Sequence, residues 1–362
     1  MRARVNHLEA TKAATAVRHP ESARAQQLQN ADNLAATPVT PPPRIVDQAA
    51  EVTTASPPHC FEVSGSLLYL QPSAGDLEYG TLISPLPITS PNWSNQSLKP
   101  GFSPAFGVEM RYIADATNDI ELNWTHLNTM TTASVVASST QMVGPPYLIG
   151  PESTPYSIGQ GSARFDYDAI SFDGGHTFCA ECPFQMRVFV GVELARIGQE
   201  VSGLFLSTDG SDSSGYTNHS LFTGVGPRLG VKGEYSFGAF QLIGEAAAAG
   251  LIGTSKSHLD FTTSTPAVSP NAQAIFSPNS TQVIPSIDSR LAIAYSFSSS
   301  SHGQFKLEAG YKAAVYFNAV SDYAVTQITT TTPVVGVFLA TEQHTFSNFT
   351  NQGPYMTGTW TF

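Results

Sequence analysis

The chain has 362 residues, of which 41% are hydrophobic and 12% are charged, and its formal net charge is −11. A typical soluble domain carries roughly 25% charged residues, so this chain is poor in charge. No run approaches the ~20 apolar residues of a membrane helix, and the best stretch, Gly244 to Gly253, is short and contains Glu245. The acidic balance argues against nucleic acid as a partner. Few charges without long apolar runs suit a transmembrane β-barrel.

Residues 1–60 form a predicted disordered leader or linker, rich in Ala, Gln, Thr and Pro. An outer-membrane protein needs a secretory signal with an apolar core of about 7–15 residues, and this stretch contains none. We therefore expect that the signal lies outside this numbering or that the start codon is misplaced. Residues 61–362 are expected to form the barrel.

From Phe61 onward, apolar and polar residues alternate with the period of two that is typical of strands. The clearest block runs from Phe305 to Phe317. The predicted strands, of about 10–14 residues, are longer than the mode of about 5–6 in globular sheets. They span roughly 61–70, 103–113, 118–129, 163–175, 184–198, 220–235, 238–252, 285–297, 304–318 and 353–362.

The connections between these strands alternate strictly between short and long. Short ones lie near 114–118, 176–183, 236–238 and 298–303, and long ones at about 71–102, 130–162, 199–219, 253–284 and 319–352. Short periplasmic turns and long extracellular loops are typical of outer-membrane barrels. The predicted fold is an all-β, transmembrane, antiparallel up-and-down barrel of ten strands. Twelve strands is the alternative, if a hairpin lies within 77–83 or 335–346.

The last strand ends the chain on an aromatic residue. Met356, Gly358, Trp360 and Phe362 share one face, and threonines occupy the other. Transmembrane barrels commonly close on such a strand. We expect it to meet outer-membrane lipid and to be the segment through which the barrel-assembly machinery handles the protein.

If the apolar face of each strand meets lipid, the charged face lines the lumen. Charges of both signs recur there, so the lumen is either a channel with a transverse field or a plug of salt bridges. The predicted lining residues are Glu109, Arg111, Glu121, Arg187, Glu193, Arg228, Lys232, Glu234, Arg290, Lys306, Glu308 and Lys312, with Glu245 on the same face. The predicted girdle aromatics are Tyr112, Trp124, Tyr235, Tyr295, Trp360 and Phe362.

The three cysteines are Cys60, Cys179 and Cys182. Cys179 and Cys182 form a C-x-x-C, but no second pair accompanies it, so a zinc site is disfavoured. The pair is a candidate disulfide, or two free thiols, in a turn between strands. Cys60 has no obvious partner. We expect no metal and no cofactor.

Three stretches resemble the Legionella major outer membrane protein-type pore-forming family. They are Phe61 to Pro72, Phe165 to Ile170 and Arg187 to Ile197, and the closing strand is also similar. The resemblance covers about residues 61–362. It implies a pore-forming protein of the bacterial outer membrane, exposed at the cell surface, and it carries over no catalytic residues.

Three functions compete. The leading one is a passive, porin-like channel for ions and small hydrophilic solutes, alone or as a homo-oligomer. The second is a plugged structural or adhesive barrel whose loops bind a partner. The third is a barrel protease that uses Asp166 and Asp168 or His258 and Asp260, which have same-face spacing. We expect no enzyme, because these groups fit hydration of the rim.

Overall fold

The computed structural model describes residues 60–75, 77–84, 92–146, 156–264, 272–299, 303–329 and 338–362. The predicted leader lies outside these residues, except for Cys60, which begins the first strand. The described residues contain no helix that is long and apolar enough to cross a membrane.

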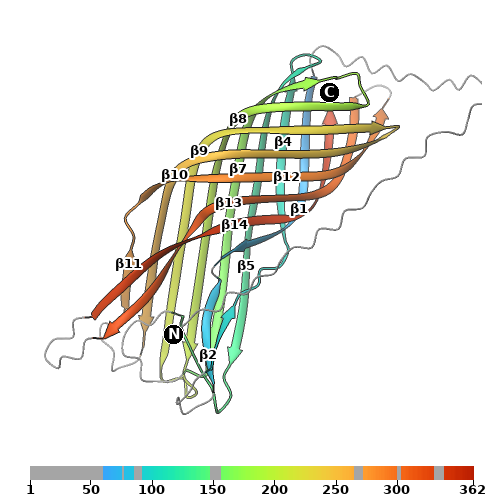
Figure 1. The fold of residues 1–362 in the computed structure, drawn as a ribbon. Coiled ribbons are helices and arrows are strands. Elements are labelled where there is room, and N and C mark those ends of the chain that lie inside the picture. Colours follow the sequence, from blue (N-terminus) through green and yellow to red (C-terminus); the bar gives the residue numbers. More distant parts are fainter. Residues whose placement is uncertain are drawn as a thin grey trace, which may run out of the picture. The chain divides into compact units, whose positions relative to one another are not determined.

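Ten long strands form a closed antiparallel barrel (Figure 1). Each strand pairs with the next along the chain, and Phe61 and Phe362 exchange backbone hydrogen bonds of 3.0 Å that close the ring. The ten-stranded prediction is confirmed, and the described residues do not form the twelve-stranded alternative. The strands are β1 (Cys60–Ala74), β4 (Ser103–Ile113), β5 (Asn118–Val136), β7 (Ile158–Phe178), β8 (Phe184–Leu206), β9 (Ser213–Phe237), β10 (Phe240–Thr263), β12 (Ser280–Ser299), β13 (Gly303–Thr329) and β14 (Phe338–Thr361).

Among the described residues, four short strands lie outside the ring. β11 (Ala272–Phe276) pairs with the distal end of β10. β2 (Glu78–Ser84), β3 (Asn92–Ser97) and β6 (Met142–Gly144) form a separate three-stranded sheet. The stretch 77–83, where a hairpin was considered, belongs to the single strand β2, which pairs with β3 and β6 and adds no strand to the barrel. The described part of 335–346 continues β14 instead of forming a hairpin of its own.

In the part of the barrel next to the short turns, the strands follow the predicted alternation. Leu67, Val190 and Leu229 are exposed on the outer face, and charged residues occupy the inner face. An apolar outer face with a polar interior is the arrangement that a membrane requires of a barrel. We call this part, which reaches from the short turns to about Trp124 and Leu194, the membrane half.

Beyond the membrane half, the same strands continue with the opposite polarity. On β7, Phe165 and Tyr167 are buried inside, while Asp166 and Asp168 lie on the outer face in line with Ile170. We call this part the extracellular half. It corrects the predicted loop boundaries, since strand structure extends to 136, 206, 263 and 329. The apolar residues of the outer face end where the surroundings of the barrel change from lipid to water. The strands themselves continue beyond that point.

The small sheet packs into the distal opening of the barrel. Tyr79 of β2 is buried, and a Cβ added to Gly161 on the inner face of β7 would lie 2.2 Å from its Cγ. The Tyr216 hydroxyl on β9 donates to the Tyr79 carbonyl at 3.0 Å. Glycine at 161 therefore provides the room that lets β2 approach the wall.

Candidate functional site: the barrel lumen

All twelve residues predicted to line the lumen lie on the inner face of the barrel. Six of them, Glu121, Arg187, Glu193, Arg228, Lys232 and Glu308, are buried, and the other six are partly buried. Alternation within each strand therefore assigns their side of the wall correctly. That they line a path for ions stays a prediction.

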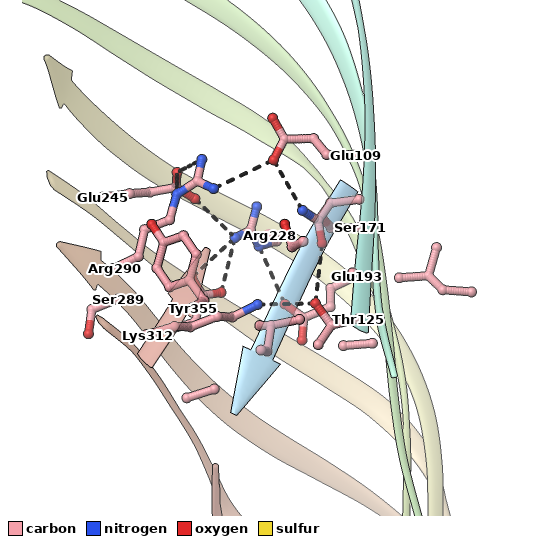
Figure 2. A pocket seen from close by; sticks show the side chains of 18 of the residues that line it. Glu109, Thr125, Ser171, Glu193, Arg228, Glu245, Ser289, Arg290, Lys312 and Tyr355 are labelled. Atoms are coloured by element: carbon pink, nitrogen blue, oxygen red, sulfur yellow. Dashed lines mark hydrogen bonds and ion pairs between the residues drawn. The ribbon is translucent and has the colours of Figure 1, made fainter. Parts of the chain in front are cut away.

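Arg228 on β9 is the centre of the network (Figure 2). Its Nη2 lies 3.0 Å from Asp288 Oδ2 and 3.8 Å from Glu245 Oε1, and its Nε lies 3.4 Å from Glu193 Oε2. It also pairs with Asp173 of β7. One guanidinium thus connects carboxylates from β7, β8, β10 and β12, as its five donors in a planar fork allow.

Two contacts cross the lumen from wall to wall. Arg290 Nη1 on β12 lies 3.5 Å from Glu109 Oε2 on β4, while its Nη2 lies 2.7 Å from Glu245 Oε2. Lys312 on β13 donates to the Thr125 hydroxyl on β5 at 3.2 Å. Since β4 and β5 are not neighbours of β12 and β13 in the ring, these bridges close the central space.

A second group of ion pairs lies toward the short turns. Arg187 Nη2 and Arg111 Nη2 reach the two oxygens of Asp119 at 2.5 Å and 2.7 Å. Arg187 Nη1 also lies 3.2 Å from Glu121. Lys232 pairs with Glu234 on its own strand at 2.7 Å. The charges here are compensated within and between adjacent strands.

Phe189 connects the two groups of ion pairs. The guanidinium carbons of Arg187 and Arg228 lie 5.0 Å and 4.9 Å from its ring centroid, within cation–π range. A Cβ added to Gly230 would lie 2.3 Å from Phe189 Cζ, and one added to Gly175 would lie 2.2 Å from Arg187 Nε. Glycine at both positions makes room for this stack.

An aromatic layer covers the ion pairs on the extracellular side. It consists of Phe165, Tyr167, Tyr316 and Phe349, whose ring centroids lie 5.4–6.3 Å apart. The Tyr316 hydroxyl donates to Glu193 Oε1 at 2.7 Å and lies 3.0 Å from the Tyr167 hydroxyl. Four rings from three strands thus span the interior and are hydrogen-bonded to the network below.

A cavity of about 70 Å³ remains between the ion pairs and this layer. Its lining includes Glu109, Arg228, Arg290, Lys312 and Tyr355, most of which Figure 2 shows pointing into the same space. A water molecule needs about 10–15 Å³ of such volume, so there is room for a handful of waters and not for a hydrated solute. At this level, side chains fill most of the lumen.

Sequence reasoning missed several members of the network. Asp119, Asp173 and Asp288 carry three of its carboxylates, and Tyr355 donates to Glu308. The alternation placed Asp119 and Asp288 on the polar face, so the signal was present in their position. Tyr167 also lies on the inner face of β7, but its residue type does not mark it as a neighbour of ion pairs.

The predicted girdle residues lie on the outer face of the barrel. A chain of ring contacts near the short turns includes Phe61 with Tyr112, Phe240 with Tyr295 and Phe305 with Trp360. Tyr235 and Phe362 join the same chain through neighbouring phenylalanines. Trp124 lies at the other edge of the apolar band, 5.1 Å from Phe106. Their position at the two membrane interfaces stays a prediction.

The groups considered for protease chemistry lie on the outer face. Asp168 Oδ1 is 2.8 Å from His126 Nδ1, and Arg196 Nη1 lies 3.3 Å from Asp166 Oδ2. His126, Asp166 and Asp168 lie close enough together to suggest a metal site. Arg196, however, already pairs with both carboxylates. His258 and Asp260 lie 3.6 Å apart on β10, also facing outward. Cys179 and Cys182 form a disulfide in a short turn, and Cys60 is a buried free thiol.

A closed, even-stranded barrel with an apolar outer band and a charged interior defines a transmembrane protein of the bacterial outer membrane. The family model described as Legionella pneumophila major outer membrane protein precursor matches residues 53–362. The chain belongs to this family, as the sequence resemblance predicted. No curated protein matches the chain at a significant level.

Several solved outer-membrane structures are similar to the chain. The outer membrane protease OmpT from Escherichia coli is 10% identical, with a TM-score of 0.40, over 84% of this chain and 97% of that one. The toluene transporter TodX of P. putida is 8% identical, with a TM-score of 0.19, over 84% and 89%. A Pseudomonas aeruginosa FadL homologue is 7% identical, with a TM-score of 0.23, over 83% and 90%. Likeness at this level supports no functional inference.

Proposed function

We propose that the protein is a narrow outer-membrane channel for ions and small hydrophilic solutes, closed in the conformation described. The observation that carries this proposal is the density of charge of both signs inside the membrane half. Ionisable residues at membrane depth are costly and commonly mark ion or substrate pathways. A lumen that only had to be filled would be at least as stable with apolar side chains of similar volume.

Purified protein in planar bilayers tests the proposal. We expect discrete single-channel conductance steps, because opening needs only the exchange of ion-pair partners and displacement of the aromatic layer. The double variant Lys306→Gln/Lys312→Gln should shift the reversal potential toward cations, since it removes two positive charges from the inner face. Lys256→Gln is the control, because Lys256 is exposed on the outer face.

The outcomes separate the alternatives. A wild-type protein without conductance steps would reject the channel. Conductance without a shift in the double variant would place both lysines outside the ion path. A shift of equal size with Lys256→Gln would mean that overall charge, and not the lumen, sets selectivity.

The second candidate is a plugged barrel with a structural or adhesive role. The wall-to-wall bridges of Arg290 and Lys312 and the aromatic layer favour it, because they leave only a small cavity. Eight-stranded barrels are filled by side chains, and ten strands is close to that size. Loop deletions that abolish binding of a partner and leave permeability unchanged would support it over the channel.

We further infer that the barrel is not an enzyme and that its partners are lipid, ions and the assembly machinery that receives the last strand. The environment of His258 and Asp260 supports the first point, because the two groups pair with each other at 3.6 Å on the outer face of β10, away from the charged lumen. Peptide cleavage that is lost in His258→Ala would contradict it. Cross-linking in native membranes tests whether the protein forms a homo-oligomer.

A further inference from the structure

The barrel wall changes its pairing where the membrane half ends. β13 is paired with β12 from Gly303 to Tyr316, where Tyr316 lies opposite Ser286. Beyond that point β12 continues alongside β10 only, and β13 continues alongside β14 only. The two strands are therefore unpaired with each other in the extracellular half, and the wall has a seam between them.

A bulge lies at the start of this seam. From Tyr316 to Val320, β13 advances by four residues. The paired segment of β14, from Phe349 to Ser347, advances by only two. Asn318 within the bulge has a φ of 59°, and its backbone N–H donates to Asn348 Oδ1 at 3.0 Å. Bulges bend the strand that carries them and weaken the ladder locally, so the chain has a defined point of bending here. We call residues 317–322 of β13 and 345–348 of β14 the arm.

The arm lies inside the ring and docks on the part of the wall that β9 and β10 form. The Ser321 backbone N–H donates to Ser220 Oγ on β9 at 2.9 Å, and its hydroxyl donates to Ser257 Oγ on β10 at 3.1 Å. The Asn218 amide of β9 donates to Asp322. All of these partners face inward and are buried, and Ala319 and Val320 are buried with them. The arm thus covers the lumen from within.

The arm is joined to the aromatic layer. Tyr316 and Phe349, two of its four rings, are the last residues before the bulge on β13 and β14, and they lie opposite each other. The contacts of Ser321 with Ser220 and Ser257 are hydrogen bonds to small hydroxyl side chains, which are individually modest. Displacement of the arm would open the mouth on the side of the seam and release two rings from above the ion pairs.

We propose that the arm is the gate of this barrel, and that it closes the lumen by docking on β9 and β10. The proposal rests on the channel function proposed above and adds its regulation. Closed and open barrels differ in whether Ser321 contacts Ser220 and Ser257. The bulge at Asn318 is the hinge, and the rest of the ring stays paired in both states.

A reversible cross-link tests the gate. Ser257→Cys/Ser321→Cys is made in a cysteine-free background, with Cys60→Ser, Cys179→Ser and Cys182→Ser. The two hydroxyl oxygens lie 3.1 Å apart, so thiols in their place are close enough to form a disulfide. We expect loss of conductance steps after oxidation and their return after reduction, while the heat-modifiable migration of the folded barrel stays unchanged.

Ser162→Cys/Ser202→Cys is the matched control. These hydroxyls lie 2.7 Å apart on β7 and β8, on the outer face of the extracellular half and away from the arm. Oxidation of this pair should leave conductance unchanged. If the oxidised Ser257/Ser321 pair conducts like the reduced one, or cannot be oxidised in the folded barrel, the gate is wrong and the channel stands. If no protein conducts, wild type included, the channel falls and the gate with it.

Discussion

The membrane half and the extracellular half of this barrel are built from the same strands with opposite polarity. On β8, Val190 is 67% exposed outside and Arg187 is 4% exposed inside, whereas nearer the distal end Glu200 lies outside and Phe205 is fully buried inside. The two-residue alternation is never interrupted between them. The alternation of apolar and polar residues along a strand therefore reflects the difference between the environments of its outer and inner faces. That difference reverses where lipid gives way to water.

The energetic consequences also differ between the halves. In the membrane half, the interior holds charges that compensate one another, and stability depends on the outer face matching lipid. In the extracellular half, the interior packs buried aromatic and aliphatic side chains together with hydrogen-bonded polar ones, and close packing contributes the stability. Four pairs of variants on matched strands or turns test this division.

The largest effect is expected for the aromatic layer. Phe165→Ala should lower the free energy of unfolding by about 3–5 kcal/mol, because it removes a fully buried ring and leaves a cavity. Phe172→Ala on the same strand should cost about 2 kcal/mol or less, since Phe172 is half exposed on the lipid face. Denaturant unfolding in detergent micelles measures both. Equal losses would contradict a close-packed interior in the extracellular half.

The next largest difference between the halves is expected when a charge is introduced on the outer wall. Val190→Arg places a guanidinium near the middle of the apolar band and should destabilise the barrel by about 2–4 kcal/mol. Leu204→Arg lies on the same face of β8, in the extracellular half, and should cost about 0–1 kcal/mol. Reversible folding into lipid vesicles gives both values. A large cost for Leu204→Arg would extend the membrane past its inferred edge.

The ion pairs of the two halves should contribute unequally. Arg228→Met leaves the carboxylates around it without their shared partner, and it should cost about 2 kcal/mol, since nearby water relieves part of the penalty. Arg196→Met removes an exposed pair on the outer face and should cost less than about 1 kcal/mol. The same unfolding assay compares them. A neutral Arg228→Met would show that the network is hydrated throughout.

The smallest effect concerns turns at opposite ends of the barrel. Hydrogen bonds from Asn118 and Thr117 hold the pKa of Asp115 well below its ordinary value, and those from Ser207 and Ser211 lower the pKa of Asp209 to about 2. A depressed pKa gives stability that is present above the unfolded value and lost as pH falls through the folded one.

The differences between wild type and Asp115→Ala, and between wild type and Asp209→Ala, should therefore shrink below about pH 4. Denaturation midpoints measured between neutral and acidic pH follow both differences. Because both turns lie in water, the two variants should behave alike. A response of only one turn would mean that the other is shielded from solvent.

The membrane half was the part that could be predicted residue by residue. Glu109 and Arg290 were assigned to the lumen from alternation alone, and they face each other across it at 3.5 Å. The extracellular half was not predicted, because Asp166 and Asp168 break an apolar-outward pattern without breaking the strand. The arm could not be predicted either, since Ser220, Ser257 and Ser321 carry no signal until the fold brings them together.

The sequence by itself determined the class of fold, the number of barrel strands and the side of the wall on which the charges of the membrane half lie. These follow from a period of two and from the alternation of short and long connections, both of which are local properties. Only the tertiary structure decided that the lumen is bridged and capped. Closure depends on contacts such as Tyr316 with Glu193, which lie on opposite walls and meet only when the ring is formed.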